Sequence, residues 1–104
     1  NPRFELYQAK YSVVPIERMN DIMVKKYTIA GKCCESGDII AEDIMLPEMK
    51  EGEYLAVLST GAYNYSMASN YNRLPRPPIV MVKDGEASLV VRRETYEDII
   101  SCDI

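Results

Sequence analysis

The chain has 104 residues, 47% of them hydrophobic, and its net charge is −4. That composition supports one domain over residues 1–104 with a modest core, and it argues against a disordered chain. The acidic balance and the absence of a basic run argue against a nucleic-acid partner or an anionic membrane surface. No apolar run approaches the ~20 residues needed to cross a bilayer.

Three cysteines and no histidine restrict the chemistry that the chain can perform. An odd count in which Cys33 and Cys34 are adjacent is a poor disulfide framework, so we expect a reducing, cytoplasmic compartment. Without His or a C-x-x-C pair we predict no metal site. The commonest general base is also missing, so any reaction must use Cys, Glu, Asp, Tyr, Arg or Lys.

The first half of the chain reads as a series of strands. Residues 4–14 alternate loosely between apolar and polar, and residues 26–33 are rich in β-branched and aromatic side chains. Residues 38–46 and 54–59 are the next predicted strands, and the Pro- and Gly-marked segment 47–52 is a turn. Ile39, Ile44 and Leu46 are the expected core positions.

The second half of the chain is predicted to hold a hairpin and a helix. Strands at 79–83 and 87–92 flank Asp84-Gly85, a strong hairpin signal. Thr95 begins a capping-box-like sequence for a short helix over 96–101. Six or seven strands at this spacing indicate an all-β fold, a β-barrel or sandwich with Greek-key-like connections and one or two short helices.

The stretch 31–38 (Gly-Lys-Cys-Cys-Glu-Ser-Gly-Asp) lies between two apolar runs and carries more chemistry than a turn needs. Ser36-Gly37-Asp38 alone would be enough to turn the chain. The adjacent Glu35 disfavours a thiolate at Cys34, and a thiol that keeps its proton suits a proton donor better than a resting nucleophile. We therefore predict a functional loop here.

Residues 60–72 form a second candidate loop. It holds three of the eight tyrosines, with small and amide residues between them. It is neither periodic like a helix nor apolar enough for a core strand. An ordered loop of this length is usually functional. The alternative interpretation is a flexible polar loop. Near the start of the chain, Arg3, Glu5 and Tyr7 share one strand face, which residue pattern alone would assign to solvent.

Four segments resemble the C-terminal β domain of the diaminopimelate decarboxylase family, pyridoxal-phosphate lyases of the alanine-racemase-like barrel class. Arg3-Phe4-Glu5-Leu6-Tyr7 is similar to the family's Arg-x-x-Leu-Tyr, and 34–38 to its Cys-Glu-Ser-Gly-Asp. Gly61-Ala62-Tyr63 followed by Tyr71-Asn72 resembles its tyrosine loop, and 92–98 its closing segment. The resemblance spans nearly the whole chain in the family's order.

The resemblance implies a role for each matched position. Cys34 would be the catalytic proton donor, which protonates the carbanion left on the substrate after carbon dioxide departs. Arg3 and Tyr7 would bind the distal carboxylate of meso-diaminopimelate, and Glu35 its distal ammonium. Tyr63 would lie against both the substrate and the phosphate of pyridoxal 5'-phosphate. Ser36, Gly37 and Asp38 would form the turn that aims Cys34 and Glu35.

The resemblance also implies partners. In the family the Cys-Glu segment enters the active site of a second subunit, so a homodimer is expected. The family's N-terminal α/β barrel supplies the Schiff-base lysine and the phosphate loop; neither is found here, so pyridoxal 5'-phosphate would be bound mainly outside this chain, and the chain alone should be inactive. A chain that opens at Asn1 without Met is interpreted as a fragment.

Two alternatives remain at this point. The first is the equivalent domain of a sister decarboxylase acting on ornithine, arginine or carboxynorspermidine; Glu rather than Asp after Cys34 counts against ornithine. The second is a stand-alone, non-catalytic β module that binds a partner or regulates a homologue. Nothing in the residues themselves excludes that module.

Overall fold

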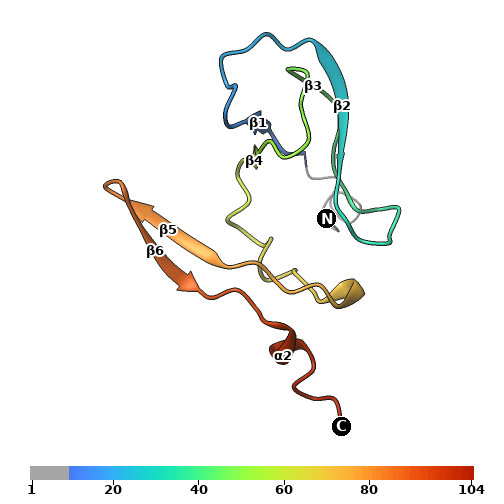
Figure 1. Cartoon of the computed structure of the whole chain (residues 1–104), viewed down its shortest axis with the longest axis vertical. Helices are drawn as coiled ribbons and strands as arrows, with labels where there is room; N and C mark the ends of the chain where they lie inside the picture. Colours follow the sequence, from blue (N-terminus) through green and yellow to red (C-terminus); the bar gives the residue numbers. More distant parts are fainter. Residues whose placement is uncertain (1–9) are drawn as a thin grey trace. The chain divides into compact units, whose positions relative to one another are not determined.

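A computed structural model describes residues 10–104 of the chain, in two compact units. The first unit ends at Asn64, and the second runs from Tyr65 to Ile104. Six strands in three antiparallel pairs, one 3-10 turn and one short α-helix make up the described part (Figure 1). The predicted all-β class with short helices is therefore confirmed. The prediction of a single domain stays a prediction.

The first unit contains two strand pairs. β1 (Val13–Pro15) pairs with β4 (Leu55–Val57), and β2 (Lys25–Ala30) pairs with β3 (Ile39–Leu46). The β2–β3 ladder runs from Lys25 opposite Leu46 to Ala30 opposite Ile39, and its register shifts twice after Tyr27. This antiparallel register brings residues 31–38 to one end of the pair as a connecting loop.

The core of the first unit is small and centred on β3. Leu46 is 1% exposed and Ala41 7%, and Pro15 at the end of β1 is also fully buried. Ile39 and Ile44, predicted as core positions with Leu46, are half-buried. Burial of a few such side chains stabilises a unit only modestly, so polar links matter here.

One polar link joins the segment after β1 to the turn before β4. The Arg18 guanidinium donates to both carboxylate oxygens of Glu53, from Nε to Oε2 at 2.8 Å and from Nη2 to Oε1 at 2.8 Å. The hydrogen bond from Arg18 lowers the pKa of Glu53 below its usual range. A two-point contact of this kind fixes the orientation of both side chains.

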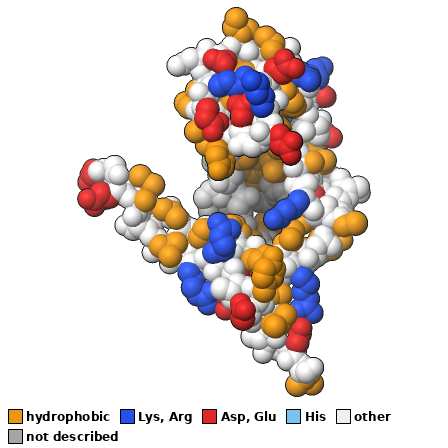
Figure 2. Space-filling view, in the orientation of Figure 1, with side chains coloured by type: hydrophobic (Ala, Val, Ile, Leu, Met, Phe, Trp, Pro, Cys, Tyr) orange, Lys and Arg blue, Asp and Glu red, His pale blue; other side chains and the backbone are white. Residues whose placement is uncertain are grey.

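The second unit is built on a hairpin of β5 (Ile79–Lys83) and β6 (Glu86–Val91). The turn residues Asp84 and Gly85 have φ values of 51° and 77°, as a two-residue hairpin turn requires. Figure 2 shows apolar side chains along this hairpin and acidic ones at its tip. Leu89 is 64% exposed and Val82 71%, so both strands present apolar side chains to solvent in this chain.

The remaining elements of the second unit are short. η1 (Tyr71–Arg73) is a 3-10 turn, and α2 (Tyr96–Ile99) is a single helical turn. Thr95 caps α2: its hydroxyl accepts from Asp98 N at 3.2 Å, and Asp98 Oδ2 accepts from Thr95 N at 2.8 Å. The predicted capping box is thus present, although the helix ends two residues before the predicted Ser101.

No helix within residues 10–104 is long and apolar enough to cross a membrane.

Candidate functional site

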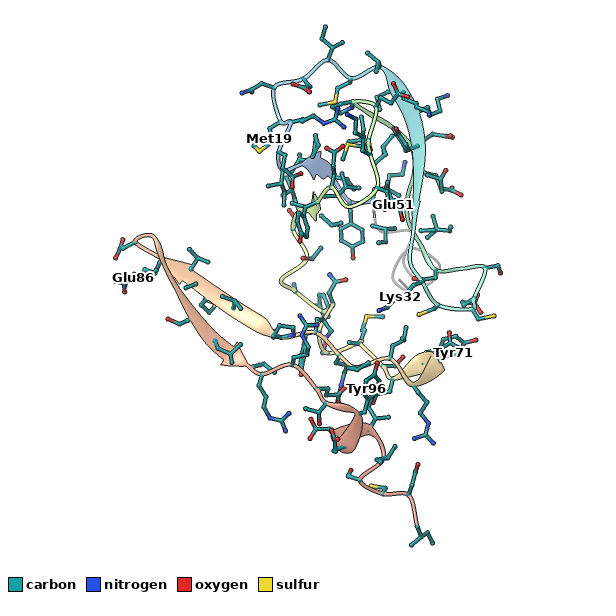
Figure 3. All side chains as sticks on the ribbon, in the orientation of Figure 1. Met19, Lys32, Glu51, Tyr71, Glu86 and Tyr96 are labelled. Carbon is teal, nitrogen blue, oxygen red and sulfur yellow. The ribbon has the colours of Figure 1, made fainter. Side chains whose placement is uncertain are left out.

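The loop between β2 and β3 presents the predicted Cys34-Glu35 pair. Gly31 N donates to Asp38 O at 2.8 Å and closes the loop directly beyond the last strand pair. Inside it, Glu35 N donates to Cys33 O at 2.8 Å, and Asp38 N donates to Glu35 O at 3.1 Å. Figure 3 labels Lys32 at the start of this loop. The loop is a compact turn that projects beyond the sheet.

Cys34 and Glu35 are both exposed at the tip of this loop. The Glu35 side chain is oriented by the turn itself, because its Oε1 accepts from Gly37 N at 2.8 Å. A carboxylate has further acceptor positions, so this bond leaves Glu35 able to accept from a cation. The thiol and the carboxylate are therefore adjacent groups that a second molecule can reach.

The neighbouring thiol differs from Cys34. Cys33 is half-buried, whereas Cys34 is exposed. Burial raises the pKa of the Cys33 thiol, and the nearby Asp38 carboxylate adds to the rise. A half-buried thiol of raised pKa is less reactive than an exposed neighbour, so Cys34 is the better candidate for chemistry.

Tyr63 lies on a separate turn that follows β4. Its φ of 70° places it in the left-handed region, which costs energy for a residue with a side chain, and it is 70% exposed. The turn is held by Asn64, whose Nδ2 donates to Thr60 O at 3.0 Å. Strained backbone held in this way is often found at functional sites.

The other two predicted site residues, Arg3 and Tyr7, lie outside the described residues. The structure thus brings Cys34 and Glu35 together on one loop and places Tyr63 on another turn of the same unit. The substrate-binding and catalytic roles of all five residues stay predictions.

Hydrogen bonds of three further residues hold these segments in place, and only Asp38 among them had a role predicted from the sequence. Gly31 and Asp38 fasten the Cys34 loop, and Asn64 holds the Tyr63 turn. A signal was available for Gly31, since a glycine directly after a strand often marks a close approach of another group.

The described residues thus form paired antiparallel strands, with Cys34 and Glu35 exposed on the loop that connects one of the pairs. Solved structures share this fold. A diaminopimelate decarboxylase from M. jannaschii superposes with a TM-score of 0.89 at 35% identity, over 98% of this chain and 23% of that chain. One from Helicobacter pylori, solved with L-lysine, gives a TM-score of 0.87 at 32% identity, over 97% and 25%.

Sequence comparison agrees with the fold. A diaminopimelate decarboxylase of Bacillus subtilis is 60% identical over the whole chain, and one of Halalkalibacterium halodurans is 53% identical. The chain spans 24% of the length of each of these two relatives. A family model described as the C-terminal sheet domain of pyridoxal-dependent decarboxylases matches residues 1–61. The chain belongs to that family, as its motifs indicated.

Proposed function

We propose that this chain is the C-terminal domain of a diaminopimelate decarboxylase, which converts meso-2,6-diaminopimelate to L-lysine and carbon dioxide. One observation carries the proposal: Cys34 and Glu35 are exposed together on a hydrogen-bonded loop, in a chain 60% identical to a relative of that name. Had the pair been enclosed in the apolar core, no substrate could have reached it.

The cofactor is pyridoxal 5'-phosphate, bound mainly by protein outside this chain. When bound, it withdraws electrons from the substrate carbon that loses its carboxylate. This chain's own contribution to it is Tyr63, whose exposed side chain and supported turn suit contact with a phosphate oxygen. A phenol can donate one hydrogen bond there without adding charge.

Substrate recognition uses the far end of diaminopimelate, which carries its own ammonium and carboxylate. The Glu35 carboxylate accepts from the ammonium, and Arg3, with Tyr7, binds the carboxylate through its planar fork. A substrate lacking either group would leave one of these side chains unpaired on binding. Such a penalty discriminates between substrates strongly.

Cys34 acts after the carboxylate has left. Its thiol proton moves from Sγ to the substrate carbon in place of the lost carboxylate. Cys33 is half-buried and takes no part in this step. The adjacent positions of Cys34 and Glu35 couple recognition of the far end of the substrate to delivery of the proton.

The Cys34 loop serves the active site of a second subunit, in a cytoplasmic homodimer. One observation supports an assembly larger than this chain, and another supports the compartment. Large apolar side chains are exposed on β5 and β6, among them Met81 at 60% and Leu89 at 64%. Exposed apolar surface of this extent normally marks an interface with other protein. Cys33 and Cys102 are thiols without a disulfide, as a reducing compartment favours.

A substrate panel tests the proposal. The full-length protein that contains this chain is purified with pyridoxal 5'-phosphate and assayed for carbon dioxide release. We expect turnover of meso-diaminopimelate with L-lysine as product, and little release from ornithine, arginine or carboxynorspermidine. Preference for one of those three amines would assign the chain to a sister decarboxylase. No release from any of them would remove the proposed activity.

A further inference from the structure

The inference concerns how the Cys34 loop keeps its shape, and it rests on the function proposed above. Three backbone positions of the loop are fastened to one residue, Asp38. Its carbonyl accepts from Gly31 N at 2.8 Å, and its amide donates to Glu35 O at 3.1 Å. Its carboxylate Oδ2 accepts from Cys33 N at 3.0 Å. Asp38 therefore holds the residues on both sides of Cys34.

Gly31 leaves the space that the Asp38 carboxylate occupies. A Cβ built on Gly31 would lie 1.9 Å from Asp38 Oδ2 and 2.4 Å from Cγ. No pair of non-bonded heavy atoms tolerates such distances. Three other glycines (Gly52, Gly61 and Gly85) would meet nothing within 4 Å at the same position. A side chain at position 31 would therefore force the Asp38 carboxylate to move.

We propose that Gly31 and Asp38 are a positioning pair for the proton donor and the substrate-binding carboxylate. Any side chain at 31 displaces the Asp38 carboxylate, and with it the bond to Cys33 N and the turn at Glu35. Cys34 Sγ and the Glu35 carboxylate then point in new directions. Displacement of a reacting group by about 1 Å can lower turnover on the order of a hundredfold.

A double-mutant cycle in the full-length enzyme tests the pair. The variants are Gly31→Ala, Asp38→Ala and the double variant, each assayed for kcat, KM and thermal unfolding. Each single variant should lower kcat at least about tenfold. The added methyl of Gly31→Ala has no carboxylate to displace once Asp38 is Ala, so the double variant should lose little more than Asp38→Ala alone.

Two controls separate position from charge. Asp38→Asn keeps an acceptor for Cys33 N at nearly the same volume, and it should retain kcat within severalfold of the original enzyme. Glu42→Ala removes an exposed acid from β3, the strand that follows Asp38, and should leave kcat and KM unchanged. A loss of turnover in Asp38→Asn as large as in Asp38→Ala would contradict positioning by this hydrogen bond.

A second readout does not depend on decarboxylation. In a Cys33→Ser, Cys102→Ser background, the rate of Cys34 alkylation by iodoacetamide should change severalfold in each single variant, because the loosened loop gives the Cys34 side chain a different position. The double variant should match Asp38→Ala. The inference is overturned if the rate of Cys34 alkylation is unchanged in the single variants. It is also overturned if Gly31→Ala has the same effect with Asp38 present as with Asp38→Ala. If the parent enzyme is inactive, that result contradicts the proposed function but not the positioning role of Gly31 and Asp38.

Discussion

Arg76 and Glu94 lie 18 positions apart and form the densest polar contact in the second unit. Arg76 Nε and Nη2 both donate to Glu94 Oε1, at 2.9 Å and 2.6 Å. The other oxygen accepts from Arg76 N at 2.7 Å and from Asn70 Nδ2 at 2.6 Å. One carboxylate thus joins the segment after the tyrosine loop to the segment that leads into α2.

The Glu94 carboxylate should make the stability of the folded protein depend on pH. Hydrogen bonds, first from the Arg76 side chain and then from its backbone, lower the pKa of Glu94 from 4.5 to about 2. A lowered pKa in the folded state stabilises the fold above pH 4.5, and this contribution is lost as pH falls towards about 2. Glu94→Gln in the full-length protein should lower Tm by several degrees at pH 7, with the difference shrinking between pH 4.5 and 2.

Arg93→Ala is the matched control for Arg76→Ala, since Arg93 is an exposed arginine next to Glu94. Arg76→Ala should lower Tm at pH 7 as Glu94→Gln does, and Arg93→Ala should not. A difference between Glu94→Gln and the parent that stays constant down to pH 2 would show that the carboxylate charge is irrelevant.

The cap of α2 predicts a local effect. Thr95→Ala removes the hydroxyl that accepts from Asp98 N, and loss of such a cap costs about 1 kcal/mol. Thr95→Ser keeps the acceptor and should be nearly neutral. Hydrogen exchange at the Asp98 amide measures this directly: the exchange rate should rise in Thr95→Ala and remain close to the original in Thr95→Ser. Equal rates in the two variants would mean that the cap has no energetic role.

Two substitutions of Tyr63 should differ in stability but weaken cofactor binding alike. Gly adopts a φ of 70° without strain, whereas Ala does not, so Tyr63→Gly should be more stable than Tyr63→Ala by about 1 kcal/mol. Both variants lack the phenol and should bind pyridoxal 5'-phosphate more weakly than the parent, as measured by cofactor absorbance in a titration. Tyr54→Phe, at another exposed tyrosine, is the control for cofactor binding.

Equal stability of the Gly and Ala variants would contradict the left-handed conformation of Tyr63. Unchanged cofactor affinity in both would remove its contact with the phosphate.

Glu35→Asp tests the specificity assigned to the loop. The shorter side chain withdraws the carboxylate from the far ammonium of diaminopimelate, so kcat/KM for this substrate should fall at least about tenfold. The ratio of rates on diaminopimelate and ornithine should shift towards ornithine. If that ratio stays constant while both rates change, Glu35 does not determine specificity.

Local chemistry made part of this structure predictable. The Asp84-Gly85 turn needs two residues that tolerate positive φ, and the cap at Thr95 needs a hydroxyl three residues before an acceptor side chain; both are readable within four residues. The all-β class followed from strands bounded by such signals. The Cys34-Glu35 pair was recognisable because its chemistry exceeds what a turn requires.

The contacts that hold the candidate site in place could not be predicted from the sequence. The Gly31–Asp38 contact arises only when the Ala30–Ile39 register brings both ends of the loop together. Asn64 bonds to Thr60 because β4 ends at Val57 and the chain then turns, which alternation of residues does not show. Arg76 and Glu94 meet across the β5–β6 hairpin, so their pairing depends on a tertiary arrangement.

The steady-state kinetics of Cys34→Ala in the full-length enzyme, beside Cys33→Ala, test the central claim most directly. If Cys34 delivers the proton, its replacement should lower kcat on meso-diaminopimelate by roughly 10²–10⁴-fold with KM close to the original. Cys33→Ala should stay within severalfold of the parent. Full turnover in Cys34→Ala, or a comparable loss in Cys33→Ala, would contradict the assignment.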